Sequence, residues 1–319
     1  MIMLRLIALL ILSVFFSACF EKDSNTIKIG ILEGPSAVSF IKMIDEPPTI
    51  AGRKVEFIIK SEPIQIQALM MQNELDFAVL PTVMAANLYN KGIDFRLLAI
   101  PIWGTLYLIS NDSAYQHIDD IENSTVHVFG QGTTADILLQ DFAQKQGMQN
   151  VKIDYSYNTN HEISAAIMHH KIKLAVVSEP MISVMLAKST DLKIITKITC
   201  EANTFLNNEN IFAQTSFLIN NRLSNYYTDI IQAITAQYSG SCDFTSQQTE
   251  EAAKLLVKHR FLPDLHTAAL SIPLCNIQYI AAAEAQDKIE QYLNIFYTFE
   301  PKSIGGKMPD DGFIYRSSH

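Results

Sequence analysis

The sequence predicts an α/β protein of two similar lobes, each with a mostly parallel sheet, joined by two crossover segments. Three observations predict it. Residues 68–80 and 165–177 repeat one pattern, 97 residues apart: a helix end, a tight turn and a short apolar strand. Helical and strand periodicities alternate along both halves, which favours sheets covered by helices. Two extended stretches, residues 95–110 and 212–220, interrupt this alternation and are predicted as the crossovers.

The repeat carries the most information. Ala, Met, Ala and Val recur at matching positions, and the other apolar positions recur by type. Unrelated helix–strand units share such patterns by physics alone, so coincidence is the alternative. The match runs without a gap over thirteen positions, which favours duplication of a lobe. Its period is too long for a stacked solenoid.

The first lobe begins with a β-branched apolar stretch that is typical of a strand, and the turn at Gly34-Pro35 ends it. Apolar residues spaced by three or four then predict helices, and short apolar runs between them predict buried strands. In chain order we expect strand 26–32, helix 37–45, strand 55–60, helix 63–74, strand 77–80 and helix 82–89.

The second lobe follows a crossover that Pro101 and Gly104 interrupt, and it repeats the same order. We expect strand 125–129, turn 130–134, helix 135–146, strand 151–157, helix 162–170, strand 174–177, helix 181–188 and strand 192–198. Helical spacing returns in residues 226–238, 249–258 and 284–299. The first lobe is therefore assigned residues 27–102 and 217–319, and the second lobe residues 103–216.

The N-terminus has the form of a secretory signal. A basic start is followed by an apolar run over residues 6–16 and by small residues before Cys19. The run is too short to span a bilayer, which needs roughly 20 apolar residues. Two interpretations stay open. Either residues 1–18 are a lipoprotein signal, with Cys19 acylated and residues 19–26 as a tether, or the signal is an ordinary cleaved one.

Composition limits the partners and the redox chemistry. The chain of 319 residues carries a net charge of −9 and no basic run, which argues against binding to nucleic acid. Besides Cys19 there are Cys200, Cys242 and Cys275. Cys242 and Cys275 could form a disulfide or remain two buried thiols. No pair of cysteines has the spacing of zinc ligands.

Candidate ligand-binding residues follow from the predicted topology. Ligands of open parallel sheets bind beyond the carboxyl ends of the strands. The cleft between two lobes is also a natural place for a small molecule. The residues selected by both rules are Glu33, Pro35, Ser36 and Thr82 in the first lobe, Gln131, Thr133, Thr134 and Glu179 in the second, and Trp103, Thr105 and Gln214 at the crossovers.

Each of these residues also has a structural explanation. Thr133 or Thr134 could simply cap the helix that follows the Gly130 loop. Trp103, the only tryptophan, could belong to the core or stack on a flat ligand. The two glutamates could cap helices or face solvent. No metal or cofactor site is predicted: the adjacent histidines at 169–170 point about 100° apart on a helix and cannot chelate one ion well.

The loops selected as ligand-binding differ in charge from those of an anion-binding site. The selected loops contain no Arg or Lys, the usual partners of a charged oxyanion. Each lobe instead offers a carboxylate, Glu33 or Glu179, and a buried carboxylate requires a cation or N–H donors. The sequence therefore favours a ligand with amino or ring N–H groups over a sulfonate.

The chain resembles the type II periplasmic binding proteins, and within them the substrate-binding lipoproteins of bacterial ABC importers of the nitrate/sulfonate/bicarbonate and thiamine-precursor group. The resemblance covers nearly all of the chain after the signal. It rests on the order and spacing of residues 28–36, 76–81, 175–180 and the closing segment 301–311.

The resemblance implies a monomer held at the cell membrane by its N-terminal lipid, facing the periplasm or the exterior. Such a protein would deliver an aminopyrimidine or a related small amine to the permease and ATPase subunits of an importer. One alternative is an anion-binding protein of the sulfonate or nitrate type. Others are a signalling receptor and an enzyme of pyrimidine synthesis, which shares this fold. No catalytic motif is recognised, so we expect no enzyme.

Anchoring can be tested by the change Cys19→Ser. Because acylation needs the thiol, this variant is expected in the soluble extracytoplasmic fraction, whereas the unchanged chain stays with the membrane. Mass spectrometry of the mature N-terminus measures the acyl group directly. Unchanged membrane association of the variant, with no acyl mass on the native chain, would contradict the lipoprotein assignment.

Overall fold

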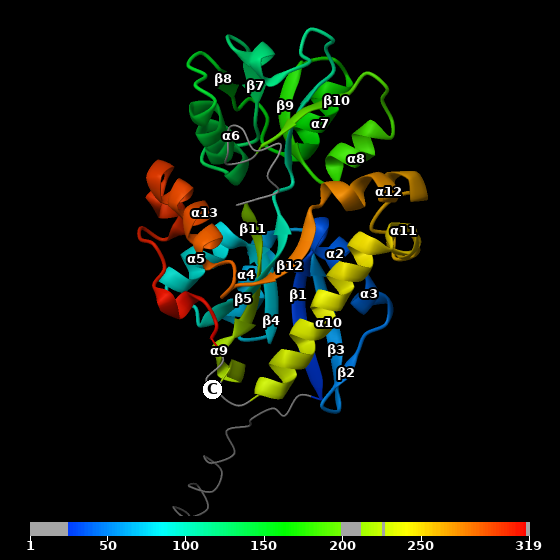
Figure 1. The fold of residues 1–319 in the computed structure, drawn as a ribbon, viewed down its shortest axis with the longest axis vertical. Coiled ribbons are helices and arrows are strands. Elements are labelled where there is room, and N and C mark those ends of the chain that lie inside the picture. Colours follow the sequence, from blue (N-terminus) through cyan, green and yellow to red (C-terminus); the bar gives the residue numbers. More distant parts are fainter. Residues whose placement is uncertain (1–24, 199–211, 225–226, 317–319) are drawn as a thin grey trace, which may run out of the picture.

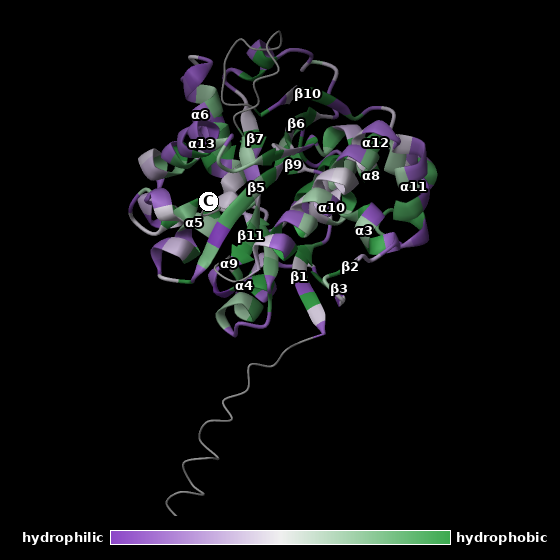
Figure 2. Ribbon diagram, turned by 60° about the horizontal axis from the view of Figure 1, so that its bottom comes forward, coloured by the Kyte–Doolittle hydropathy of each residue, from purple (hydrophilic) through white to green (hydrophobic). Residues whose placement is uncertain are grey.

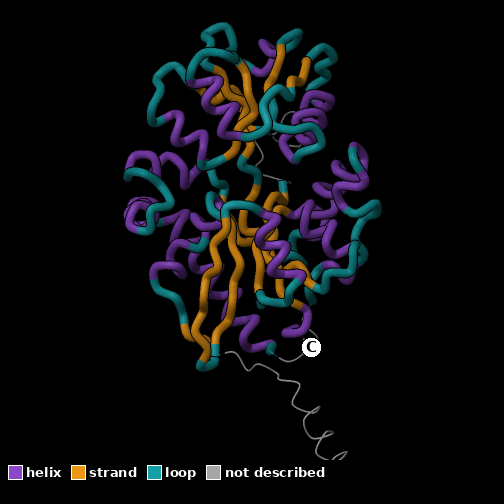
Figure 3. The backbone as a smooth tube through the Cα atoms, turned by 180° about the vertical axis from the view of Figure 1, so that it is seen from behind, coloured by secondary structure: helices purple, strands orange, loops and turns teal. Residues whose placement is uncertain are grey.

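The fold consists of two β-sheets, each flanked by helices and stacked end to end (Figure 1). A computed structural model describes residues 25–198, 212–224 and 227–316. Cys19, Cys200 and the predicted signal lie outside these residues. Seen from behind, the strands form two groups with helices on either side of each (Figure 3).

The larger sheet has seven strands in the order β12-β5-β11-β4-β1-β3-β2. Its strands are β1 (Thr26–Leu32), β2 (Thr49–Ile50), β3 (Arg53–Lys60), β4 (Phe77–Pro81), β5 (Phe95–Trp103), β11 (Ala213–Asn220) and β12 (Ile277–Ala281). β1 pairs in parallel with β3 and β4, whereas β11 runs antiparallel to both β4 and β5. The carboxyl ends of β1, β3, β4 and β5 therefore meet at one edge.

The smaller sheet has five strands in the order β10-β6-β9-β7-β8. They are β6 (Leu106–Ser110), β7 (Thr125–His127), β8 (Lys152–Asp154), β9 (Leu174–Ser178) and β10 (Lys193–Lys197). β7 is parallel to β8 and β9, and β6 is antiparallel to β9 and β10. Both sheets are thus mixed rather than mostly parallel, because strands that enter from or return to the crossovers run against their neighbours.

Helices cover both faces of each sheet. In the larger lobe they are α2 (Pro35–Ser39), α3 (Ile41–Asp45), α4 (Pro63–Met71), α5 (Thr82–Asn90), α9 (Asn221–Ser224), α10 (Thr228–Gln247), α11 (Thr249–Lys258), α12 (Leu265–Leu274) and α13 (Gln286–Phe299). In the smaller lobe they are α6 (Thr134–Lys145), α7 (Asn160–Met168) and α8 (Met181–Leu186). Short 3-10 turns lie at Ile118–Ile121, Pro301–Ile304 and Asp311–Phe313.

The crossovers are shorter than the sequence suggests. β5 ends at Trp103 and β6 begins at Leu106, so only two residues separate them. β11 pairs with the larger sheet from its first residue, with Ala213 opposite Trp103. Gln214, assigned from the sequence to the second lobe, therefore lies on a strand of the larger sheet.

Apolar burial holds each lobe together and also joins the lobes. Strands of both sheets are largely hydrophobic in Figure 2. Leu80 and Leu97 of the larger lobe and Leu108 and Val126 of the smaller one belong to a single buried cluster, which passes through Trp103 at the crossover. The two cores are therefore continuous.

The opposite face of the larger sheet has an aromatic centre. Phe40, fully buried, stacks on Tyr238 with 3.6 Å between ring centroids and meets Phe57 and Phe217 edge to face. The Tyr238 hydroxyl and Ser39 Oγ are hydrogen-bonded at 2.8 Å. This arrangement anchors α10 and the end of α2 to the sheet.

Three points of the sequence analysis can be compared directly with the structure. Helix α12 and strand β12, between the predicted helices 249–258 and 284–299, were not predicted. Cys242 and Cys275 are both buried free thiols, so no disulfide joins them. None of the helices in the described part of the chain combines the length and apolar character needed to cross a membrane.

The aromatic centre should carry much of the stability of the larger lobe. Phe40→Ala is expected to lower the free energy of unfolding by about 3–5 kcal/mol, because it leaves a cavity where the ring contacts were. Tyr297→Ala is the matched control, since Tyr297 is 41 % exposed and its loss should cost within about 0.5 kcal/mol. Urea unfolding measures both changes, and equal losses would contradict this assignment.

Candidate functional site

The carboxyl ends of strands from both sheets face one another across the junction of the lobes (Figure 1). This is the edge at which open α/β sheets bind ligands. The lobes touch here, since a Cβ placed on Gly34 of the larger lobe would lie 3.2 Å from Cδ of Pro180 in the smaller lobe. Gly34 has a φ of +80°, which glycine adopts without strain.

The turn after β1 presents one exposed and one buried polar residue. Glu33 is exposed, and its backbone N–H donates to the carbonyl oxygen of Lys60 at 2.9 Å. Pro35 opens α2, where its fixed φ suits the first turn of a helix. Ser36 follows with only 4 % of its surface exposed.

Thr82 is the most unusual polar group of the larger lobe. It begins α5 directly after β4 and is fully buried. Its Oγ1 has no hydrogen-bond partner among the described residues. Buried hydroxyls nearly always have a hydrogen-bond partner, so Thr82 Oγ1, beside the ends of the strands, is a candidate contact for a ligand.

The two crossovers are joined through side chains. Gln214 Oε1 accepts a hydrogen bond from the backbone N–H of Thr105 at 2.6 Å, and Gln214 Nε2 donates to Thr105 Oγ1 at 2.8 Å. Both groups of the amide are thus used to hold one crossover against the other. Their direct contact with a ligand stays a prediction.

Trp103 lies in the core rather than on an open surface. It is 2 % exposed, its indole N–H donates to the carbonyl oxygen of Gln278 at 2.8 Å, and Lys288 Nζ lies 5.7 Å from the ring centroid. Of the two explanations that the sequence left open, this position favours the core. Stacking on a ligand would need the ring to leave these contacts.

The Gly130 loop is closed by its own helix. Thr133 caps α6, its Oγ1 accepting from the backbone N–H of Asp136 at 3.4 Å. Asp136 is fully buried and accepts hydrogen bonds from Gly132 N at 2.7 Å, Tyr155 Oη at 2.7 Å and Gln140 Nε2 at 2.8 Å. This carboxylate occupies the place at the helix N-terminus that an anionic ligand would otherwise take.

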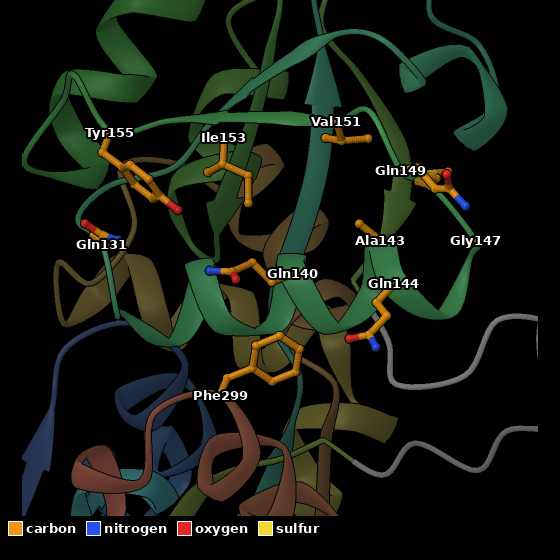
Figure 4. A pocket seen from close by; sticks show the side chains of 11 residues that line it. Gln131, Gln140, Ala143, Gln144, Gly147, Gln149, Val151, Ile153, Tyr155 and Phe299 are labelled. Carbon is orange, nitrogen blue, oxygen red and sulfur yellow. The ribbon is translucent and has the colours of Figure 1, made fainter.

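A cavity of about 670 Å³ lies beside α6, where α13 of the larger lobe approaches the smaller one. Figure 4 shows Gln131, Gln140 and Tyr155 on one side of it and Phe299 of α13 below. Gln131 is exposed and is the predicted ligand residue that lines this cavity. Thr134 begins α6 and is partly exposed.

Glu179 is buried at the opposite side of the junction, 4 % exposed, after the end of β9. Its Oε1 accepts from Ser183 Oγ at 2.9 Å and its Oε2 from Ser271 Oγ at 2.7 Å. Burial raises the pKa of Glu179 to about 7, although the serine hydroxyls favour the charged form. Its two oxygens are therefore already partnered by protein.

The structure adds polar residues that the sequence analysis missed. Asn160 begins α7, donates from Nδ2 to Ser178 Oγ at 3.3 Å, and leaves its buried Oδ1 without a partner among the described residues. Lys197 ends β10 and lies 3.4 Å from the carbonyl oxygen of Trp103. Burial lowers the pKa of this lysine to about 8. β10 runs antiparallel to β6, so the rule for the carboxyl ends of parallel strands did not select its end.

The absence of basic residues from the selected loops does not exclude a cation near the crossovers. The selected loops do lack Arg and Lys, but Lys197 reaches the crossover from the neighbouring strand. Within the described residues there is no group of three or more His, Cys, Asp or Glu side chains that could hold a metal ion.

Known proteins that resemble this chain are found among solved structures. No protein-family model and no curated protein matches the chain. Among solved structures, an ABC transporter from Parabacteroides distasonis matches with a TM-score of 0.82 and 33% identity, over 92% of this chain and 100% of the other.

Two more distant structures show the fold alone. The periplasmic aliphatic sulphonate-binding protein SsuA of Escherichia coli matches with a TM-score of 0.72 and 15% identity, over 93% of this chain and 94% of that one. The alkanesulfonate-binding protein SsuA of Xanthomonas axonopodis, bound to MOPS, gives 0.63 and 13%, over 91% and 96%. The predicted periplasmic-binding-protein fold is thereby confirmed. Together with the P. distasonis match, it shows that this chain belongs to the substrate-binding proteins of ABC importers.

Proposed function

We propose that this protein captures a small polar molecule outside the cytoplasm and delivers it to the permease and ATPase subunits of an ABC importer. The observation that supports this most is the orphaned hydroxyl of Thr82, buried where the strand ends of the two lobes meet. Asn160 supplies a second buried oxygen from the opposite lobe, which also has no partner among the described residues. Each lobe therefore has a polar atom available to a ligand.

The proposed ligand contacts follow from polar atoms without a protein partner and from position at the strand ends. Thr82 and Asn160 are the strongest, because their buried oxygens have no partner among the described residues. Ser36 lies buried in the turn region after β1, and Glu33 adds an exposed carboxylate beside it. The other predicted contacts, which already have protein partners or lie at the margin, are Pro35, Trp103, Thr105, Gln131, Thr133, Thr134, Glu179 and Gln214.

Two ligand classes are supported by different observations. The carboxylate of Glu33 suits an amine or a ring N–H group, as in an aminopyrimidine. Lys197 supports the second class, an anion of the sulfonate or nitrate type, because a buried ammonium gains from a charged partner. The orphan oxygens Thr82 Oγ1 and Asn160 Oδ1 are compatible with N–H donors; only the threonine hydroxyl can also donate to an anion.

A binding role accounts for these features without catalysis. The strand ends of the two sheets face one another across the junction, and the polar groups there are suited to hydrogen bonding. The proposal includes a single chain as the working unit, a lipid on Cys19 and a place at the cell membrane. The crossover that follows Trp103 would be the hinge about which the lobes close. Phe217 lies buried within β11 of the larger sheet and is therefore not part of a crossover.

Native mass spectrometry of the purified chain tests the function. A solute retained from the cells should appear as one additional mass, released unchanged on denaturation. Its composition separates an amine from a sulfonate. Conversion of the released solute on incubation with fresh protein would instead indicate an enzyme. Absence of any retained or added solute across amines, sulfonates and nitrate would contradict the proposal.

Thr82→Val tests the site itself. The hydroxyl has no partner to lose, so stability should stay unchanged, while affinity for the recovered solute should fall by about 0.5–1.5 kcal/mol, or roughly two- to tenfold. Thr235→Val is the matched control, because its hydroxyl lies on α10 and bonds to Ile231 O at 2.9 Å. Calorimetry measures both affinities; an unchanged affinity in Thr82→Val would remove this residue from the site.

A further inference from the structure

Glu179 accepts two hydrogen bonds, one from its own lobe and one from the other lobe. Ser183 belongs to α8, which follows Glu179 in the smaller lobe, so its 2.9 Å bond lies within one lobe. Ser271 belongs to α12, which packs in one buried cluster with α3 and α11 of the larger lobe. The 2.7 Å bond from Ser271 to Glu179 therefore passes between the lobes. α8 and α12 are in contact along this junction, on the right of Figure 1.

The surroundings of the carboxylate are polar but uncharged. Tyr107 of β6 donates from its hydroxyl to the carbonyl oxygen of Leu274 at 2.8 Å and accepts from Asn276 Nδ2 at 2.9 Å. Cys275, one turn beyond Ser271, lies 3.7 Å from the Ser271 hydroxyl. The contacts of Tyr107 also cross between the lobes, so Glu179 belongs to an extended junction.

The titratable groups that face Glu179 cannot neutralise it. They are the phenol of Tyr107 on β6 and the thiol of Cys275 on α12, whose pKa values are both raised, chiefly by burial. Glu33, on the turn that meets Pro180, is exposed and of the same charge. Among the described residues no Lys, Arg or His forms a salt bridge with Glu179. The ionised carboxylate is therefore desolvated without a counter-charge.

Separation of the lobes would change this balance. Ser271 would withdraw with α12, and water would reach the carboxylate from the side that α12 now covers. Hydration favours the charged form, so the carboxyl group would hold its proton less tightly in separated lobes than in joined ones. Joining the lobes would then take up a proton.

We propose that Glu179 is a positioning residue for solute capture, which couples the joining of the two lobes at α8 and α12 to the uptake of one proton. This inference rests on the proposed function only for its biological meaning. Its physical content concerns the lobes alone and is independent of which solute is bound.

The direction and size of the pH effect follow from the pKa of Glu179 with the lobes joined and with the lobes separated. The pKa is about 7 with the lobes joined and returns toward the ordinary 4.5 when water enters. A raised pKa in the joined state means that the proton favours joining, and this advantage disappears as the pH rises through 7. Between pH 5 and pH 8 the ratio of joined to separated lobes should fall roughly fifty- to hundredfold if the carboxylate is fully hydrated on separation.

Small-angle scattering from the solute-free chain carrying Cys19→Ser tests the proposal. The radius of gyration should increase from pH 5 to pH 8. Glu179→Gln mimics the protonated side chain, and it should remain compact at both pH values. Glu74→Gln, an exposed carboxylate of the larger lobe, should follow the unmodified chain.

The serines supply a matched pair of variants. Ser271→Ala removes the hydrogen bond between lobes and should shift the chain toward the larger radius at every pH. Ser183→Ala removes a bond of similar length within one lobe and should not. Circular dichroism confirms that each variant is folded before the comparison.

Two results would overturn the proposal. One is a radius that does not change with pH in the unmodified chain, which needs no variant to observe. The other is an unaltered pH response in Glu179→Gln. Because no solute is present, these results are separate from the mass spectrometry of the proposed function. A chain that retains no solute could still close with a proton, and a solute-binding chain could show no pH response.

Discussion

The apolar core that passes through the crossovers is the constraint on which the rest of the structure depends. Trp103 and Phe212 bring the buried cluster of one lobe into contact with that of the other. Both crossover chains must therefore stay close together, and the hydrogen bonds between Thr105 and Gln214 satisfy their polar groups. With the crossovers fixed, the strand ends of the two sheets have to face one another.

The polar groups along this junction divide into those with hydrogen-bond partners and those without, and the proposed site uses the second kind. Asp136 accepts three hydrogen bonds and so occupies the N-terminus of its own helix, α6. Glu179 takes two serine hydroxyls. Thr82 and Asn160 keep oxygens without partners among the described residues. A buried polar atom without a partner costs free energy, which a bound solute can recover by completing the hydrogen bond.

The ionisable groups at the junction, Glu179 and Lys197, are buried without forming an ion pair with each other. Burial raises the pKa of Glu179 and lowers that of Lys197, so each group moves toward its neutral form near neutral pH. Several other charges of the described residues are paired, as in the exposed pair of Lys42 with Glu46 at 2.9 Å. Buried single charges respond to any motion that admits water, which makes the junction sensitive to lobe separation.

The sequence by itself determined the two-lobed α/β architecture, because apolar periodicity and the repeat of residues 68–80 at 165–177 depend only on local pattern. It also placed Thr82 directly after a strand, as the structure does, while the contact of Thr82 with a ligand stays a prediction. Only the tertiary structure decided that Trp103 is core, that Glu179 bonds to Ser271, and that Lys197 reaches the crossover. Those outcomes depend on contacts between residues distant in sequence, about which local periodicity carries no information.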